Sequence, residues 1–215
     1  MLQRLFAGFL PEGGNPFEAF RAKALVAYLF IVLMVAGLWG VEHALVRAWA
    51  PMALYAVVLV ALVIVLLRQR RRPDTRGNAR LAILVGVVAI TVATYLTGGL
   101  RMTNIVPFLG LMVAAVFLLG REGVYWTLAV LVLALGFQVG HWAGVPYPDA
   151  VPPEARPTDA FITWFSTTLL VMLWLWAYER ARTQTTEALA EGQRRVRAIF
   201  DGTPDLALLH DEEGC

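Results

Sequence analysis

The chain has 215 residues, of which 59% are hydrophobic and only 16% are charged, with a net charge of +2. A soluble globular domain has about 45–50% apolar and about 25% charged residues, so this composition excludes a soluble enzyme, a disordered tail and a nucleic-acid-binding module. The single cysteine, Cys215, excludes a disulfide framework or a cysteine-based zinc site within the chain. The composition indicates a membrane protein whose main partner is the lipid bilayer.

Charged residues divide the chain into six long uncharged windows. A helix needs about 20 apolar residues to cross the hydrocarbon core, and a charge at mid-membrane costs about 2.5–3.5 kcal/mol. We therefore expect an all-α polytopic membrane protein with a bundle of six transmembrane helices, the fifth ending near His141. The windows are residues 24–41, 48–67, 81–100, 102–120, 123–148 and 160–178.

Lysine and arginine are distributed unevenly between the segments that flank these windows. With the N-terminus inside the cell, all but three of the 18 Lys and Arg residues lie in inner segments, and only Arg47, Arg101 and Arg156 lie outside. Positive charge accumulates on the cytoplasmic side of membrane proteins, so we expect both termini in the cytoplasm and a location in the bacterial inner membrane. The basic run at residues 68–72 adjoins two spans, which favours topology and anionic lipid over nucleic acid as its explanation.

The sequence divides into four segments. Residues 1–22 are expected to form a cytoplasmic segment that lies in the membrane interface, and residues 23–178 the six-helix domain. Residues 179–200 predict an exposed helix that continues the sixth span. In residues 201–215 a helix stop is followed by a short apolar run and an acidic turn. This pattern predicts the start of a soluble domain, so we expect the chain to be a fragment of a longer protein.

The helix after the sixth span has few apolar residues. Leu189, Val196 and Ile199 fit the seam of a weak coiled coil. Two interpretations stay open: a juxtamembrane helix that ends in solvent, and a signalling helix that pairs in a homodimer.

Two groups of residues carry a resemblance to known proteins. The helix that ends at Phe200, the Thr203-Pro204-Asp205 motif, the strand at 206–209 and Gly214 resemble the opening of a PAS domain. Upstream, the sequence is similar to the six-span sensor module at the N-terminus of bacterial sensor histidine kinases. The residues that carry this second likeness are Thr97, Gly98, Gly99, Pro107 and the Leu119-Gly120-Arg121-Glu122-Gly123 turn.

The resemblance implies a dimeric input module, cut at the start of its PAS-like α/β domain. Such a module passes a membrane signal through PAS to a histidine kinase core, which acts on a response regulator in two-component signal transduction. Related modules also feed diguanylate cyclases. The resemblance places no catalytic residue, phosphoacceptor or cofactor in this chain.

One face of the third span carries small and hydroxyl-bearing residues. Thr91, Thr94, Tyr95 and Gly98 are spaced as neighbours on a helix. Such residues usually face other helices in a membrane, so they indicate either helix packing or the lining of a ligand cavity near the outer leaflet.

Ionisable and polar residues end two spans at the same outer surface. Glu42 and His43 end the first span, and Gln138 and His141 end the fifth. Such residues are functional candidates by default, and imidazoles with a carboxylate can bind a metal or sense pH. Simple anchoring is the first interpretation, a polar signal pocket the second and a metal site the last, so we predict no metal and no cofactor.

The outer loop at residues 142–159 is too short to fold as a receptor domain. The signal should therefore be read within the bundle or at its outer end, which favours a small hydrophobic molecule or a property of the bilayer. The candidate signal pocket comprises Thr94, Gly98, Arg101, Asn104, Gln138 and His141.

The sixth span has a hydroxyl-rich outer half and an aromatic inner end. The hydroxyl groups are expected to contact other helices, and the aromatic rings to form a belt at the inner interface. The hydroxyl-bearing residues are Thr163, Ser166, Thr167 and Thr168, and the aromatic residues are Trp174, Trp176 and Tyr178.

Two competing functions are less well supported by the sequence. A transporter or channel is disfavoured because the spans contain almost no ionisable residues and no pair of interrupted helices. A membrane enzyme is disfavoured because the spans contain no HExxH motif, no paired aspartates and no Ser/His/Asp set.

Overall fold

The computed structural model describes residues 16–99 and 102–202, and these residues form long helices joined by short turns. Each uncharged window overlaps one helix, and the described residues contain no strand beyond an isolated bridge between Thr97 and Asp149. The helices are α2 (Pro16–Leu45), α3 (Trp49–Arg71), α4 (Thr75–Leu96), α5 (Met102–Leu119), α6 (Arg121–Trp142) and α7 (Arg156–Gly202), with the short 3-10 helix η1 (Pro153–Ala155) before α7.

The all-α architecture is confirmed. The expected end of the fifth span near His141 is also confirmed, because α6 ends at Trp142. Of the expected interfacial segment at residues 1–22, residues 1–15 lie outside the described residues and residues 16–22 belong to α2. Of the expected PAS start at residues 201–215, only the last two residues of α7 are described.

Five helices are long and apolar enough to cross a membrane, which marks the chain as a multi-pass membrane protein. The spans are Glu18–Leu45, Trp49–Arg71, Thr75–Leu96, Arg121–Trp142 and Pro153–Arg180. The remaining expected span corresponds to α5, whose apolar part, Ile105–Leu119, is shorter.

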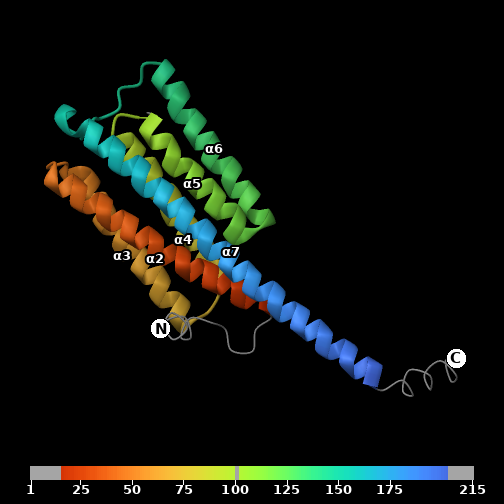
Figure 1. The fold of residues 1–215 in the computed structure, drawn as a ribbon. Helices are drawn as coiled ribbons and strands as arrows, with labels where there is room; N and C mark the ends of the chain where they lie inside the picture. The colour runs from red at the N-terminus through yellow and green to blue at the C-terminus, as the bar shows by residue number, and fades with distance from the viewer. Residues whose placement is uncertain (1–15, 100–101, 203–215) are drawn as a thin grey trace.

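The helices form a bundle in which α2 and α7 lie side by side (Figure 1). Helix α2 packs against α3 and α7, while α5 packs against α4, α6 and α7. Helix α6 contacts mainly α5, and its buried residues are only Gly123 and Val130. The core between the other helices combines aliphatic side chains, with Leu25, Leu29 and Ile83 fully buried, and several buried aromatic rings.

Helix α7 is a single helix of 47 residues. At 1.5 Å per residue it is about 70 Å long, more than twice the roughly 30 Å of a hydrocarbon core. Figure 1 shows that α7 runs along the whole bundle and then continues beyond it. The prediction that the sixth span continues as an exposed helix is therefore confirmed.

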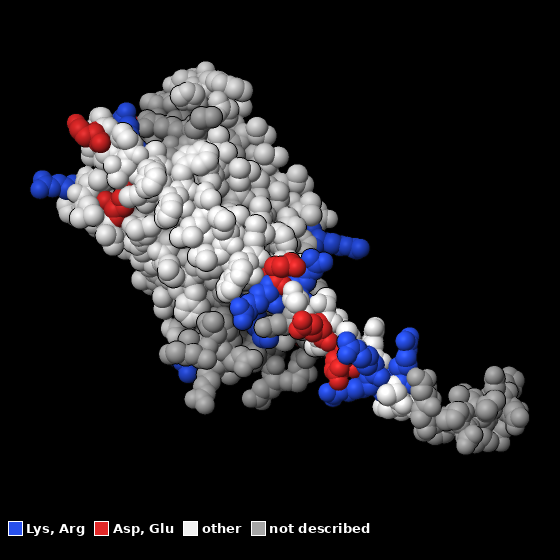
Figure 2. Space-filling model, in the orientation of Figure 1, with Lys and Arg blue, Asp and Glu red and all other residues white. Residues whose placement is uncertain are grey.

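On the face that Figure 2 shows, the charged side chains of the described residues gather at the two ends of the bundle and on the protruding part of α7. Figure 2 shows a broad uncharged area between these charged regions. Large apolar side chains such as Met34 and Val132, in the middle of their helices, are exposed. At the end near the protrusion, Arg80 and Arg76 of α4 pair with Glu122 of α6 at 2.6 Å and 3.5 Å.

The turn between α3 and α4 is closed by buried polar groups. The amide nitrogen of Asn78 donates to Gln69 Oε1 at 2.7 Å and to the Arg72 carbonyl at 3.3 Å. Both side chains are fully buried. The carboxylate of Asp74 accepts from the Gly77 amide at 2.9 Å and caps α4, which satisfies a donor that the helix itself leaves unpaired.

Replacing Asn78 with leucine is expected to lower the free energy of unfolding by about 1–3 kcal/mol, because the buried Gln69 oxygen loses its donor. The double variant Gln69→Leu/Asn78→Leu should recover part of this loss, since it removes both polar partners. Thermal unfolding in detergent measures both effects. A double variant less stable than Asn78→Leu alone would contradict this account of the turn.

Candidate functional site

The interior of the bundle contains an apolar cavity of about 80 Å³. Five helices, α2, α3, α4, α5 and α7, contribute to its walls. Its lining includes Tyr28, Leu62, Gly86, Pro107 and Leu170. A hydrophobic molecule is the kind of ligand that such walls accommodate.

A second cavity of about 40 Å³ adjoins the first, and its lining is more polar. The two share Trp39 and Tyr55, and the second adds His43, Thr94 and Asp159. It lies where α2 ends and α7 begins. The interior therefore changes from apolar at its centre to polar at the end of the bundle opposite the protruding helix.

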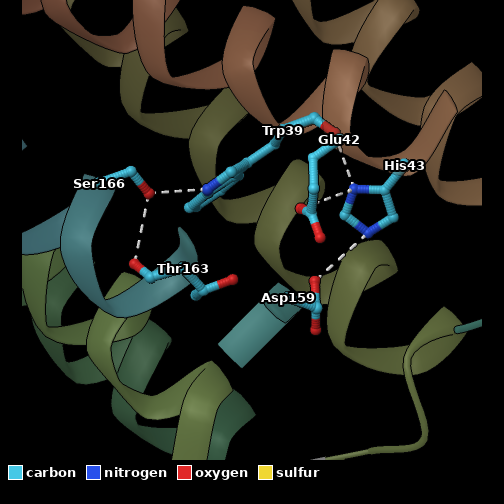
Figure 3. A network of polar contacts seen from close by, with 6 residues as sticks. All are labelled: Trp39, Glu42, His43, Asp159, Thr163 and Ser166. Atoms are coloured by element: carbon cyan, nitrogen blue, oxygen red, sulfur yellow. Dashed lines mark hydrogen bonds and ion pairs between the residues drawn. The ribbon is translucent and has the colours of Figure 1, made fainter. Parts of the chain in front are cut away.

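A chain of hydrogen bonds joins α2 to α7 beside this polar cavity (Figure 3). The indole nitrogen of Trp39 donates to Ser166 Oγ at 2.8 Å, and Ser166 Oγ donates to the Thr163 carbonyl at 3.3 Å. The rings of Trp39 and Tyr55 meet edge to face at 5.4 Å. Of the four hydroxyl-bearing residues expected to face other helices, three are buried, namely Thr163, Ser166 and Thr167. The fourth, Thr168, is exposed.

Glu42, His43 and Asp159 converge at the polar end of this network (Figure 3). His43 Nδ1 lies 2.7 Å from the Trp39 carbonyl and 3.6 Å from Glu42 Oε2, while His43 Nε2 lies 3.7 Å from Asp159 Oδ1. Glu42 and His43 are 5% and 3% exposed. An imidazole and two carboxylates so close together can share a proton or hold a cation.

The structure distributes the expected pocket residues over different places. Thr94 is buried and lines the polar cavity. Gly98, with a φ of 89°, lies in the turn after α4. Gln138 and His141 lie on α6, away from the walls of both cavities, and His141 is exposed.

The other two expected pocket residues cannot be placed in the same way. Arg101 and the side chain of Asn104 lie outside what the structure describes. Of the four expected residues that the structure describes in full, Thr94 is the one that lines the polar cavity.

Sequence reasoning did not identify Asp159 or Tyr55 as site residues. Asp159 follows a proline-rich loop and lies far along the chain from Glu42 and His43. One signal could have suggested it: with six spans, the start of the last span lies at the same membrane surface as the end of the first. The sequence analysis instead grouped Glu42 and His43 with Gln138 and His141 at that surface.

The aromatic end of α7 differs from the expected interfacial belt. Trp174 is 2% exposed and packs edge to face against Phe117 and Tyr28, with ring centroids 4.8 Å and 6.4 Å away. The prediction that Trp174 belongs to the interfacial belt is wrong, because its ring fills the interior between α2 and α5. Trp176 is 59% exposed, with Arg180 lying 5.5 Å from its ring centre, as a belt residue should be.

Compared with known proteins, the chain matches no protein-family model and no curated protein.

Proposed function

We propose that this chain is the membrane-embedded signal-input module of a bacterial sensor histidine kinase. One observation carries the proposal: α7 begins beside the polar cavity and runs unbroken through the bundle into the protruding helix. A change at the outer end can therefore shift or rotate a rigid element that leaves the other end of the membrane domain. Shifts and rotations of a rigid helix between two positions are a known way of transmitting conformational change through a protein.

The proposal includes six crossings, a location in the inner membrane and both termini in the cytoplasm. The excess of Lys and Arg in alternate connecting segments supports this orientation. Helix α5, the fourth in chain order, would supply the crossing that is missing from the five long apolar helices, since its 18 residues span about 27 Å. The protruding part of α7 would then lie in the cytoplasm.

The cavities support a small hydrophobic molecule as the signal. The larger cavity of about 80 Å³ has room for only a few heavy atoms. A larger ligand would have to separate the helices, and α7 contributes Thr167 and Leu170 to the cavity walls. Ligand entry would thus displace the helix that connects to the output.

The protruding helix supports the proposed homodimer. Leu189 and Val196 are each 53% exposed and lie one heptad apart, with Ile199 also exposed. These residues form the seam that a second copy of the helix would cover. Downstream PAS and kinase domains acting on a response regulator complete the proposed pathway.

Cysteine cross-linking tests the pairing. In a Cys215→Ser background, Leu189→Cys and Val196→Cys are expected to form disulfide-linked dimers in membranes under mild oxidation. Arg194→Cys, an exposed residue off the seam, is the matched control and should cross-link far less. Equal cross-linking at all three positions would contradict a paired seam.

A reporter fusion tests the signalling function. Residues 1–202 are joined to the cytoplasmic part of a sensor kinase, and insertions of about one to seven residues follow Glu191. We expect kinase output to vary periodically with insertion length, because each residue rotates the helix. Deleting residues 17–150 should abolish this response. Output that is flat across the insertions and unaffected by the deletion would overturn the proposal.

The same fusion does not distinguish a kinase output from a cyclase output. A diguanylate cyclase reporter would respond equally well to a rotating helix, so the alternative remains an input module for a cyclase. A small-solute transporter would instead show flux in proteoliposomes.

A further inference from the structure

The cluster of Glu42, His43 and Asp159 joins the first helix of the bundle to the helix that leaves it. One donor atom from each residue lies within 4.8 Å of the donor atoms of the other two. Two of the residues are buried, and the side chain of Asp159 is only 18% exposed. Figure 3 shows the two carboxylates and the imidazole turned toward one another.

The hydrogen bond of His43 fixes which ring nitrogen can bind a ligand. Nδ1 lies 2.7 Å from the Trp39 carbonyl, an acceptor, so Nδ1 carries the proton and donates it there. In the neutral ring this leaves a lone pair on Nε2, which faces Asp159 Oδ1 at 3.7 Å. A backbone carbonyl behind the imidazole is the arrangement that orients histidine ligands of metals.

The carboxylate of Glu42 is buried without a matching donor. Among the residues that the structure describes, neither carboxylate oxygen of Glu42 has a hydrogen-bond partner, and His43 Nε2 has none either. Burying a carboxylate without compensation is costly. With neutral His43, the two carboxylates give the cluster a charge of −2, which a divalent cation neutralises.

We propose that Glu42, His43 and Asp159 bind a divalent transition-metal ion of the zinc class at the outer end of the bundle. Zinc accepts one imidazole nitrogen with carboxylate oxygens and keeps an open position when the protein supplies three ligands. Calcium prefers six to eight oxygen ligands, more than this cluster offers. The adjoining polar cavity, lined by Thr94 and Thr97, provides room for a water molecule on the open position.

The geometry requires a small adjustment on binding. Two ligands of one tetrahedral zinc ion lie about 3.3–3.5 Å apart, whereas the donor atoms here are separated by up to 4.8 Å. Rotation about the side-chain bonds of Glu42 and Asp159 can close this difference. The bound ion would tie α2 to α7, because Glu42 and His43 lie on one helix and Asp159 on the other.

The binding claim does not depend on the proposed signalling function, and the experiment measures binding alone. The full chain, purified in detergent without a histidine tag, is titrated with Zn²⁺ against a fluorescent chelator and with Co²⁺ by visible absorption. We expect one saturable site per chain. The variants Glu42→Gln, His43→Gln and Asp159→Asn should each weaken binding about 100-fold or more, beyond the effect of losing an outer-shell partner.

Two matched controls lie at the same end of the protein. Asp149→Asn removes a carboxylate that pairs with Arg156 at 2.6 Å, and His141→Gln removes an exposed imidazole; both should bind Zn²⁺ like the wild type. If His43→Gln does not fold, Asp159→Asn supplies the comparison, since its side chain is the least buried of the three. Absence of a saturable site, or equal weakening in the controls, would overturn the proposal.

Discussion

Replacing Trp174 with alanine is expected to lower the free energy of unfolding by about 2–3 kcal/mol. The ring is 2% exposed and lies between Tyr28, Phe117 and Tyr178, so its removal leaves a cavity. Lipid is as apolar as the protein interior, so little transfer energy is lost, and the cavity term of about 24 cal/mol per Å³ dominates. Thermal unfolding in detergent, followed by circular dichroism, measures the loss.

Trp176→Ala is the matched control for this substitution. Trp176 lies two residues further along α7 but is 59% exposed, so its removal opens no interior cavity. We expect its unfolding temperature to stay close to that of the wild type. Equal destabilisation by the two substitutions would show that Trp174 does not fill the interior of the bundle.

Replacing Gly123 with alanine is expected to destabilise the contact between α5 and α6 by about 1–3 kcal/mol. A Cβ at this position would collide with the backbone carbonyl of Ala115 and with the Cα of Val116. Because backbone atoms cannot rotate away as a side chain does, the two helices would have to separate. The hydroxyl of Thr127, which lies 3.3 Å from the Met112 carbonyl, would move apart from its acceptor as well.

Gly136→Ala provides the control on the same helix. No heavy atom lies within 4 Å of a Cβ built at Gly136, and alanine is favoured over glycine in a helix by about 1 kcal/mol. This variant should therefore unfold at the same temperature as the wild type or slightly higher. If Gly123→Ala were as stable as Gly136→Ala, the close approach of α5 and α6 would be contradicted.

The positions of the helices could be predicted from the sequence because charge is costly in a bilayer. All but the first residue of the uncharged window at 48–67 lie within α3 (Trp49–Arg71), and turn residues after His141 marked the end of α6. The continuation of the last span was likewise visible, because charged residues replace apolar ones after Tyr178 with no proline and a single glycine, Gly192, before α7 ends at Gly202.

The inward-facing side chains could not be predicted in the same way. In a soluble helix the polar face marks the outside, but a helix in lipid is apolar on both faces. Thr94 and Tyr95 were expected on one face, yet Thr94 is 2% exposed and Tyr95 49%. Trp174 and Trp176 differ similarly, and nothing in their local sequence distinguishes the buried ring from the exposed one.

The candidate site depends even more on tertiary structure. Glu42 and His43 were visible as an ionisable pair at the end of a span, whereas Asp159 reaches them only because α7 packs along α2. That packing follows from matching helix surfaces, which one sequence does not reveal. The proposed metal site becomes visible only when the third group, Asp159, is placed beside the other two.

Accessibility labelling of single cysteines tests most directly whether α7 connects the outer surface to the cytoplasm. In a Cys215→Ser background, Glu154→Cys in η1 just before α7 and Glu191→Cys in the protruding part of α7 are treated with a membrane-impermeant maleimide. We predict that residue 154 is labelled in cells with a permeabilised outer membrane, and residue 191 only after the inner membrane is opened. Labelling of both residues from the same side would contradict the account.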